Sequence, residues 1–311
     1  MPTKTFRSSS RSATKTCKSA GKNAGKGARK NAGKDARKSA GKDACKSEVS
    51  LMKEQIFFAD EQHIKQDLQH FYDQEAKKYH ETRKKFWKDA EYLLEAMKGL
   101  EGRKVRILEF GCGSGRFATY LSEHYAGKFE YLGVDLSQKL IDFAQKEHPH
   151  LRFICADISS FILRQEQESF DIIIGTSSFQ HIPSYQERLF LMKYFYGMLS
   201  YGGLLMMINR SFSQRFVKKY WKAVFSAVGR WMVSFGRKSW RDILVPRRKK
   251  EEVFFRYYHL FGLQELRKLS KFSGFSLVQL GFIDQEGRLG VKGRKARSSL
   301  LVAKKAPISF S

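Results

Sequence analysis

Apolar residues are spaced in two different ways along this chain of 311 residues. From about Ile56 onward, short apolar runs alternate with segments in which apolar residues recur every three or four positions. The runs are typical of buried strands, and the segments are typical of amphipathic helices. The predicted strands cover residues 105–110, 129–134, 151–155, 170–175, 203–209, 276–283 and about 298–304. The predicted helices cover residues 60–98, 115–125, 137–147, 184–199 and 263–273.

This alternation of strands and helices with short connections predicts an α/β domain built on a parallel sheet. The strands of a parallel sheet are buried on both sides, so we expect helices on both faces. The turn between Gly287 and Gly293 joins the last two predicted strands. It indicates a hairpin that closes the sheet.

Residues 1–48 follow neither pattern. Lysine recurs at every fourth position from Lys18 to Lys46, and alanine stands two residues after each of the first seven of these lysines. Because almost nothing there is apolar and larger than alanine, burial cannot offset the entropy lost on ordering. We therefore predict that residues 1–50 are a disordered Lys/Ala-rich basic tail and that residues 51–311 form the folded domain. The tail is interpreted either as a tether to nucleic acid or as a solubilising segment.

Charge is concentrated at the two ends of the chain. The net charge is +27, with 14 basic and 3 acidic residues in residues 1–48, 20 and 22 in residues 49–209, and 24 and 6 in residues 210–311. A cationic field of this kind attracts polyanions, so RNA, DNA or anionic lipid is the predicted partner. No apolar run reaches the length of about 18 residues that a membrane span needs. The cysteines lack metal-ligand spacing and the N-terminus lacks a signal sequence, so we expect reduced thiols, no metal site and a cytoplasmic protein.

The clearest chemical signal is the segment VRILEFGCGSGRFATYL, residues 105–121. A predicted strand ends there in Gly111, Gly113 and Gly115, and a predicted helix begins at once. Glycines let the backbone turn sharply and approach a ligand where a Cβ would intrude. The helix N-terminus adds unpaired N–H groups. The loop therefore predicts a nucleotide-like ligand.

Three carboxylates restrict the chemical class of the predicted ligand. Asp135 ends the next predicted strand, about 20 residues after the loop, where a carboxylate can accept both ribose hydroxyls of a nucleoside. Glu109 stands two positions before the first glycine, where it would repel a pyrophosphate but suits a cationic or zwitterionic ligand. Asp157 follows the third predicted strand and is placed to accept from an adenine amino group.

Together with Cys155 to Ile158, Phe170-Asp171 and Gly202-Gly203, these residues resemble the motif series of class I S-adenosylmethionine-dependent methyltransferases. The resemblance implies a Rossmann-like sheet of seven mostly parallel strands with an antiparallel last strand. It also implies that Glu109 lies near the methionine end of S-adenosylmethionine, that Asp135 binds the ribose and that Asp157 binds the adenine. The full set of implied cofactor residues is Tyr79, Arg83, Glu109, Gly111, Cys112, Gly113, Gly115, Asp135, Leu136, Asp157, Ile158 and Thr176.

Two flanking segments resemble one subfamily, the tRNA wobble-uridine methyltransferases that esterify 5-carboxymethyluridine. Residues 71–97 resemble its first helix, with Tyr79 and Arg83 matching, and residues 242–248 and 254–269 resemble its Val-Pro and Arg-Tyr-Tyr-His segments. The chain departs from this pattern at Gln180, where the subfamily has a histidine, and at Arg247, where it has a tryptophan.

These residues suit methyl transfer to a carboxylate. An ionised carboxylate needs no general base, so positioning is the main task. Arg256 can orient a carboxylate bidentately, Tyr257 and His259 can line its pocket, and His181 falls beside the transferring methyl group. The alternatives of edge packing for residues 256–259 and of a passive pocket wall for His181 stay open.

Residues 210–250 interrupt the alternation with a basic, tryptophan-rich insertion. Apolar residues recur there at helical spacing with basic residues around them. The apolar positions are Phe216, Tyr220, Val224, Val228, Trp231 and Phe235, and the basic positions are Arg215, Lys218, Lys219, Lys222 and Arg230. We predict a basic amphipathic helix or helix pair that caps the active-site edge and that docks RNA, lies on an anionic membrane, or serves as a lid with an apolar core face. Residues 247–250 are expected to be exposed.

The leading hypothesis is a methyltransferase that acts on a carboxymethylated wobble uridine, with tRNA or another nucleic acid as partner. The resemblance also allows an activating protein subunit. One alternative is a methyltransferase of a small or membrane-associated carboxylate, with the insertion on the membrane surface. Another is a non-catalytic nucleic-acid-binding protein built on a methyltransferase scaffold.

Overall fold

The computed structural model describes residues 61–83, 88–236, 238–249 and 252–306. All of them belong to the larger of the two units of the chain, Glu54–Ser311. The tail predicted for residues 1–50 lies outside the described residues, and so do the side chains of residues 247–250.

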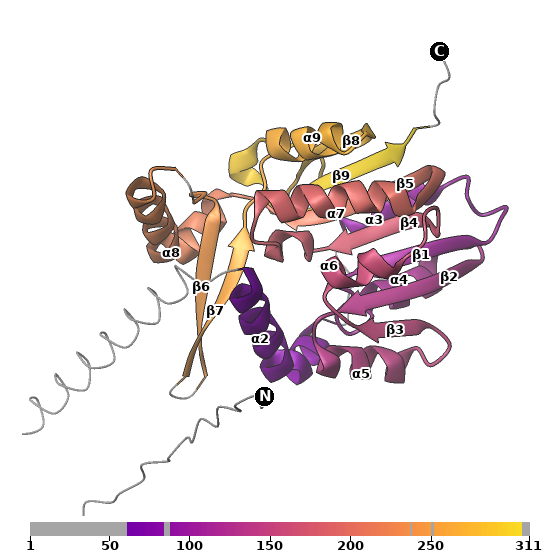
Figure 1. Ribbon diagram of the computed structural model, residues 1–311, viewed down its shortest axis with the longest axis horizontal. Helices are drawn as coiled ribbons and strands as arrows, with labels where there is room; N and C mark the ends of the chain where they lie inside the picture. Colours follow the sequence, from indigo (N-terminus) through magenta and orange to yellow (C-terminus); the bar gives the residue numbers. More distant parts are fainter. Residues whose placement is uncertain (1–60, 84–87, 237, 250–251, 307–311) are drawn as a thin grey trace, which may run out of the picture. The chain divides into compact units, whose positions relative to one another are not determined.

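A seven-stranded sheet forms the centre of this unit (Figure 1). Its strands are β1 (Val105–Phe110), β2 (Phe129–Asp135), β3 (Arg152–Cys155), β4 (Phe170–Thr176), β5 (Leu199–Arg210), β8 (Phe275–Ile283) and β9 (Ser298–Lys305). They lie side by side in the order β3-β2-β1-β4-β5-β9-β8. β9 is antiparallel to both of its neighbours, whereas the β1 to β5 pairs are parallel. The predicted fold class and the antiparallel last strand are confirmed.

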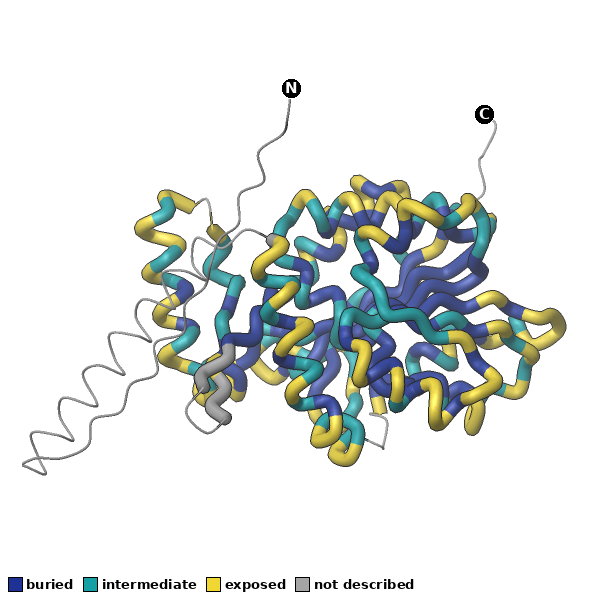
Figure 2. The backbone as a smooth tube through the Cα atoms, turned by 60° about the horizontal axis from the view of Figure 1, so that its bottom comes forward, coloured by how far each residue is buried: buried dark blue, intermediate teal, exposed yellow. Residues whose placement is uncertain are grey.

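Helices cover both faces because successive strand residues point to opposite sides. In β1, Ile107 belongs to a core that includes α3 (Ala90–Met97) and α4 (Arg116–His124). Its neighbour Leu108 belongs to a core that includes α6 (Ile158–Phe161), α7 (Tyr185–Met198) and α9 (Leu263–Phe272). Helix α5 (Gln138–Glu147) lies beside β2 and β3. Figure 2 shows the strands buried between these layers.

The prediction of one continuous helix over residues 60–98 is wrong. The structure has two helices, α2 (Glu61–Thr82) and α3, with residues 84–87 outside the described part. Just before α3, the fully buried Asp89 pairs with Arg297. This contact with a distant part of the chain fixes where α3 begins, which local periodicity cannot indicate.

The insertion also differs from its prediction. Its first part is helical, α8 (Gln214–Val233), but its second part is an antiparallel hairpin of β6 (Asp242–Lys249) and β7 (Glu252–His259). Ile243 and Val245 of β6 and Tyr258 of β7 pack on α8 in a separate apolar cluster. The hairpin connection lacks the Gly, Asn or Pro that usually marks a turn, and a run of charged residues fills it, so no local signal indicates the turn.

Candidate active site

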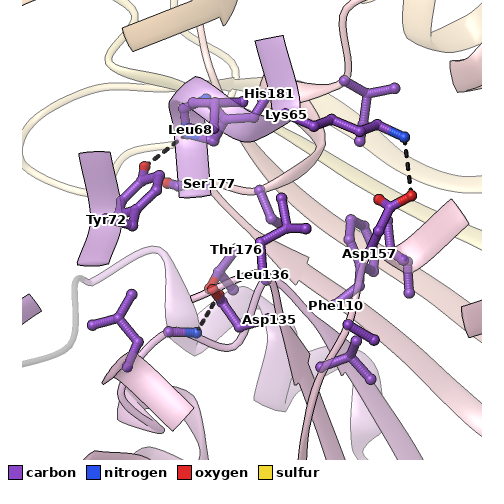
Figure 3. Close-up of a pocket in the computed structure, with 18 of the residues that line it drawn as sticks. Lys65, Leu68, Tyr72, Phe110, Asp135, Leu136, Asp157, Thr176, Ser177 and His181 are labelled. Carbon is purple, nitrogen blue, oxygen red and sulfur yellow. Dashed lines mark hydrogen bonds and ion pairs between the residues drawn. The ribbon is translucent and has the colours of Figure 1, made fainter. Parts of the chain in front are cut away.

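A cavity lies where β1, β2, β3 and β4 end, between the sheet and α2 (Figure 3). Ligands of open α/β sheets bind at this carboxyl edge. Helix α2 contributes Lys65, Leu68, Tyr72 and Tyr79, and the strand ends and their loops contribute Phe110, Gly111, Gly113, Val134, Asp135, Leu136, Leu140, Ala156, Asp157, Ile158, Thr176, Ser177, Ser178, His181 and Ile182.

The glycine loop between β1 and α4 forms one wall. Gly111, Gly113 and Gly115 all have positive φ, at 67°, 57° and 79°, a region that other residues rarely adopt. A Cβ on Gly111 would lie 2.2 Å from the Cβ of Ser178, so only glycine fits there. A Cβ on Gly113 would lie 3.5 Å from the ring of Tyr79. The backbone is thereby brought close to whatever occupies the cavity.

Asp135 connects the end of β2 to this loop. Its Oδ2 accepts a 2.8 Å hydrogen bond from the backbone N–H of Gly113, and its Oδ1 accepts one of 2.9 Å from Ser137. Burial raises the pKa of Asp135, and these backbone donors act in the opposite direction. A carboxylate offers about four acceptor sites, so the oxygens can still accept from ligand hydroxyls in the cavity.

Asp157 faces the cavity from the segment after β3. Its Oδ2 lies 3.1 Å from the Nζ of Lys65, and Lys65 also pairs with Glu187 of α7. Lys65 therefore ties α2 across this end of the cavity, where it holds the Asp157 carboxylate in place (Figure 3). Leu136 and Ile158 supply apolar wall nearby.

His181 lies at the other end, on a short 3-10 turn (Phe179–His181) after β4. Its Nδ1 is 2.7 Å from the carbonyl oxygen of Tyr257, which can only accept, so Nδ1 carries the proton. Burial, together with the positive charges of Arg256, Arg210 and Arg83, lowers the pKa of His181 to about 3. The imidazole is therefore neutral, and its Nε2 accepts from the hydroxyl of Tyr72 at 2.9 Å.

The charges of three guanidinium groups act on this histidine. Arg256 of β7 is buried, 4.5 Å from the ring centre of Tyr258 and 6.0 Å from that of Tyr72. Arg210 ends β5, and Arg83, which follows α2, lies 4.3 Å from the ring centre of Tyr79. Burial lowers the pKa of Arg210, and the nearby charge of Arg83 lowers it further. None of the three lines the cavity itself, but their charges act at the end where His181 lies.

Glu109 does not line the cavity. It is buried in β1, where it accepts hydrogen bonds from the hydroxyls of Tyr131 and Thr176, and only Thr176 reaches the cavity wall. Burial raises its pKa from 4.5 to about 8, so the carboxyl is largely protonated at neutral pH. Glu109 was expected near the methionine end of the cofactor. Its connection to the cavity is indirect, through its hydrogen bond with Thr176.

We expect Glu109 to make stability fall as pH rises. The folded protein holds this proton up to about pH 8, whereas the unfolded chain releases it near 4.5. The stabilisation is complete below the lower pKa and is lost as pH rises through the higher one. Thermal unfolding without cofactor at a series of pH values should show this loss in wild type and a flatter profile in Glu109→Gln. Parallel profiles would contradict the expectation.

The other expected site residues divide into two groups. Tyr79, Leu136, Ile158 and Thr176 line the cavity, whereas Arg83, Cys112, Gly115, Tyr257 and His259 do not. The hydroxyl of Tyr257 lies 2.7 Å from Asp242, and His259 lies between Asp242 and Glu265, at 2.7 and 2.8 Å. His259 therefore connects the hairpin to α9 through Glu265, whereas Tyr257 bonds to Asp242 within the hairpin.

Of the four α2 residues in the wall, sequence reasoning identified Tyr79 as a site residue and missed the others, Lys65, Leu68 and Tyr72. Gln180, which stands where the subfamily has a histidine, is buried and accepts a 2.5 Å hydrogen bond from the backbone of Arg210. It holds the end of β5 beside His181 rather than facing the cavity.

The cavity fits the adenosyl cofactor that the sequence implies. It has a glycine wall with no room for a Cβ at Gly111, and carboxylates from two successive strand ends at Asp135 and Asp157. Apolar side chains suited to a purine ring lie between them. The strand order and the glycine loop are those of the class I methyltransferase fold, and the two carboxylates fit its cofactor.

Comparison with known proteins agrees. Residues 107–203 match the family model described as Methyltransferase domain. The ubiquinone biosynthesis O-methyltransferase of Coxiella burnetii is 33% identical over 119 residues, which cover 36% of this chain and 47% of that protein. The malonyl-acyl-carrier-protein O-methyltransferase 1 of Ilyobacter polytropus is 30% identical over 105 residues, covering 32% and 36%. The match thus spans less than half the length of either relative.

Solved structures share the fold. A methyltransferase of Methanosarcina mazei is 21% identical, with a TM-score of 0.52, and the match covers 65% of this chain and 93% of that one. A methyltransferase of Haloferax volcanii, in complex with the Trm112 methyltransferase activator, is 13% identical with a TM-score of 0.55, covering 78% and 99%. The chain contains a class I S-adenosylmethionine-dependent methyltransferase domain, an enzyme domain whose cofactor is S-adenosylmethionine.

In the described residues, no helix has the length and apolar character to cross a membrane.

Proposed function

We propose that this protein O-methylates a carboxylate, and that the carboxylate is the carboxymethyl group of a modified wobble uridine in tRNA. The observation that carries the proposal is the positive charge of Arg83, Arg210 and Arg256, which acts on the neutral His181 at one end of the cavity. Guanidinium groups bind carboxylates with paired hydrogen bonds. An acceptor that is already an anion is the one that such a site attracts.

The residues present perform positioning rather than proton transfer. When bound, S-adenosylmethionine would supply a methyl group on a sulfonium: a carboxylate oxygen would bond to that carbon without losing a proton, as the bond to sulfur breaks and S-adenosylhomocysteine leaves as a neutral thioether. Asp135 and Asp157 are proposed to hold the ribose and the adenine, and Arg256 to orient the acceptor. His181 has too low a pKa to act as a general base near neutral pH, and an ionised acceptor needs none. Holding donor and acceptor in line is the catalytic contribution we assign to the chain.

The tRNA assignment is supported by charge and by the flanking segments. Residues 210–311 carry 24 basic residues against 6 acidic ones, and residues 1–48 carry 14 against 3. Phosphate contacts from such segments provide sequence-independent affinity for RNA. An activating subunit belongs to the proposal as well. The Haloferax volcanii methyltransferase is bound to one, although its likeness to this chain is one of fold.

A small carboxylate or acyl-carrier acceptor is the second candidate. The name of the Ilyobacter polytropus relative specifies a malonyl group on an acyl carrier protein, which is also a carboxylate. The same positive end of the cavity would receive it. The two candidate functions differ in the molecule that carries the carboxylate: tRNA in the first, and an acyl carrier protein or a small molecule in the second.

The test is transfer of a tritiated methyl group from S-adenosylmethionine by the full-length protein, with and without cell extract to supply a subunit. Acceptors are tRNA that bears unesterified carboxymethyluridine, the same tRNA without it, malonyl-acyl carrier protein and free dicarboxylates. We expect alkali-labile label only in the first. Label only in the carrier protein or dicarboxylates would establish the second candidate. Cofactor binding with no transfer to any of them would favour a scaffold that binds nucleic acid.

A further inference from the structure

Helix α8 and the turn after it expose an apolar surface, here called the α8 patch: Trp221, Phe225, Trp231, Met232, Val233 and Phe235. These six are half of the large apolar side chains exposed in the part of the chain that the structure describes. Phe225 is 68% exposed, Val233 77% and Phe235 94%. Soluble proteins rarely expose so many large apolar side chains on one helix and the turn after it without a partner.

The patch is not the core face of the helix. Phe216, Val224 and Ala227 of α8 are buried against the β6–β7 hairpin, so that face is already covered. Of the apolar positions identified from the sequence, Trp231 and Phe235 thus fall outside this core. Exposed residues recur along the length of α8 (Figure 2).

The charges around the patch all have one sign. Between residues 210 and 241 the chain has nine basic residues and no acidic one. Arg215, Lys218, Lys219 and Lys222 are exposed on α8 itself, and a break in helical geometry at Tyr220 separates most of them from the patch. Trp221, Phe225 and Met232 lie four and seven positions apart, which places them on one side of the helix.

We propose that the α8 patch docks on an anionic lipid bilayer. A helix with exposed Trp and Phe beside lysines lies in the plane of the interface, with its apolar side chains at the acyl boundary and its cations against the head groups. A second copy of this chain is a poorer occupant, because two such surfaces would face each other with like charge. RNA is also poorer, because Met232 and Val233 have no ring to stack on a base. The inference does not depend on the proposed acceptor.

Lipid insertion must be separated from electrostatic adsorption, because the basic residues 1–48 are also expected to attract anionic vesicles. The chain has four tryptophans, of which Trp221 and Trp231 belong to the patch. In Trp87→Phe/Trp240→Phe, bromine on the acyl chains of phosphatidylglycerol vesicles should quench the remaining fluorescence. In Trp221→Phe/Trp231→Phe it should not. Vesicles of phosphatidylcholine alone should bind far less of either variant.

The second measurement is flotation with the same vesicles. Phe225→Ser/Met232→Ser should lower binding by about 10-fold or more, because two large apolar side chains no longer enter the bilayer. The matched control is Leu163→Ser/Val278→Ser, which removes side chains of similar exposure, 57% and 60%, elsewhere on the molecule. Flotation without quenching, equal loss in both double variants, or a dimer or RNA complex that only the α8 variant disrupts would overturn the proposal.

Discussion

Replacing Asp135 with alanine is expected to lower the affinity for S-adenosylmethionine by about 100-fold. The substitution removes the carboxylate that faces the cavity and also frees the N–H of Gly113, which now donates to it at 2.8 Å. A hydrogen bond to a charged group contributes about 1.5 kcal/mol or more, and two such bonds to a ribose correspond to about two powers of ten in Kd. Isothermal titration of the purified protein measures this directly.

The matched control is Asp142→Ala, since that exposed side chain on α5 contacts only Gln138 among the hydrogen bonds of the described residues. Its affinity should equal that of wild type. Thermal unfolding of both variants shows whether the fold is kept. Unchanged cofactor affinity in a folded Asp135→Ala protein would contradict the assignment of Asp135 to the ribose.

The sheet could be predicted because its signal is local. In β4 every residue is buried, and the sequence reads as one apolar run that ends near Thr176. The β6–β7 hairpin shows the limit of such reasoning. Ile243 and Val245 are buried only because α8 covers them, and the connection between the strands is charged and lacks a turn residue.

Some of the residues that line the cavity could likewise be predicted from the sequence, and others could not. The loop glycines and Asp135 stand at fixed distances along the chain from β1 and β2, so their order alone places them at one edge of the sheet. Lys65 meets Asp157 across 92 residues, and Tyr72 meets His181 across 109. No local pattern encodes such contacts, because they depend on where α2 packs.

Glu109 shows that a correct position in a motif does not fix the environment of a side chain. From the sequence it stands beside the glycine loop, facing a cationic ligand. In the structure the strand turns it into the core, toward Tyr131, and Thr176 lies between it and the cavity. The alternation of faces along β1 determines this, and the loop that follows begins only at Gly111.

Arg256 is expected to separate acceptor binding from cofactor binding. Arg256→Met should lower kcat/KM for a carboxylate acceptor by about 100-fold, because a paired, charge-assisted contact is lost, whereas the Kd for S-adenosylmethionine should stay within about twofold. Arg256→Lys keeps the positive charge but not the paired N–H donors of a guanidinium group. Its activity should therefore lie between that of wild type and that of Arg256→Met. The control is Arg267→Met on the exposed side of α9, which should behave as wild type. An equal loss of cofactor affinity in Arg256→Met would show instead that this buried guanidinium, packed beside Tyr258, supports the fold of the site.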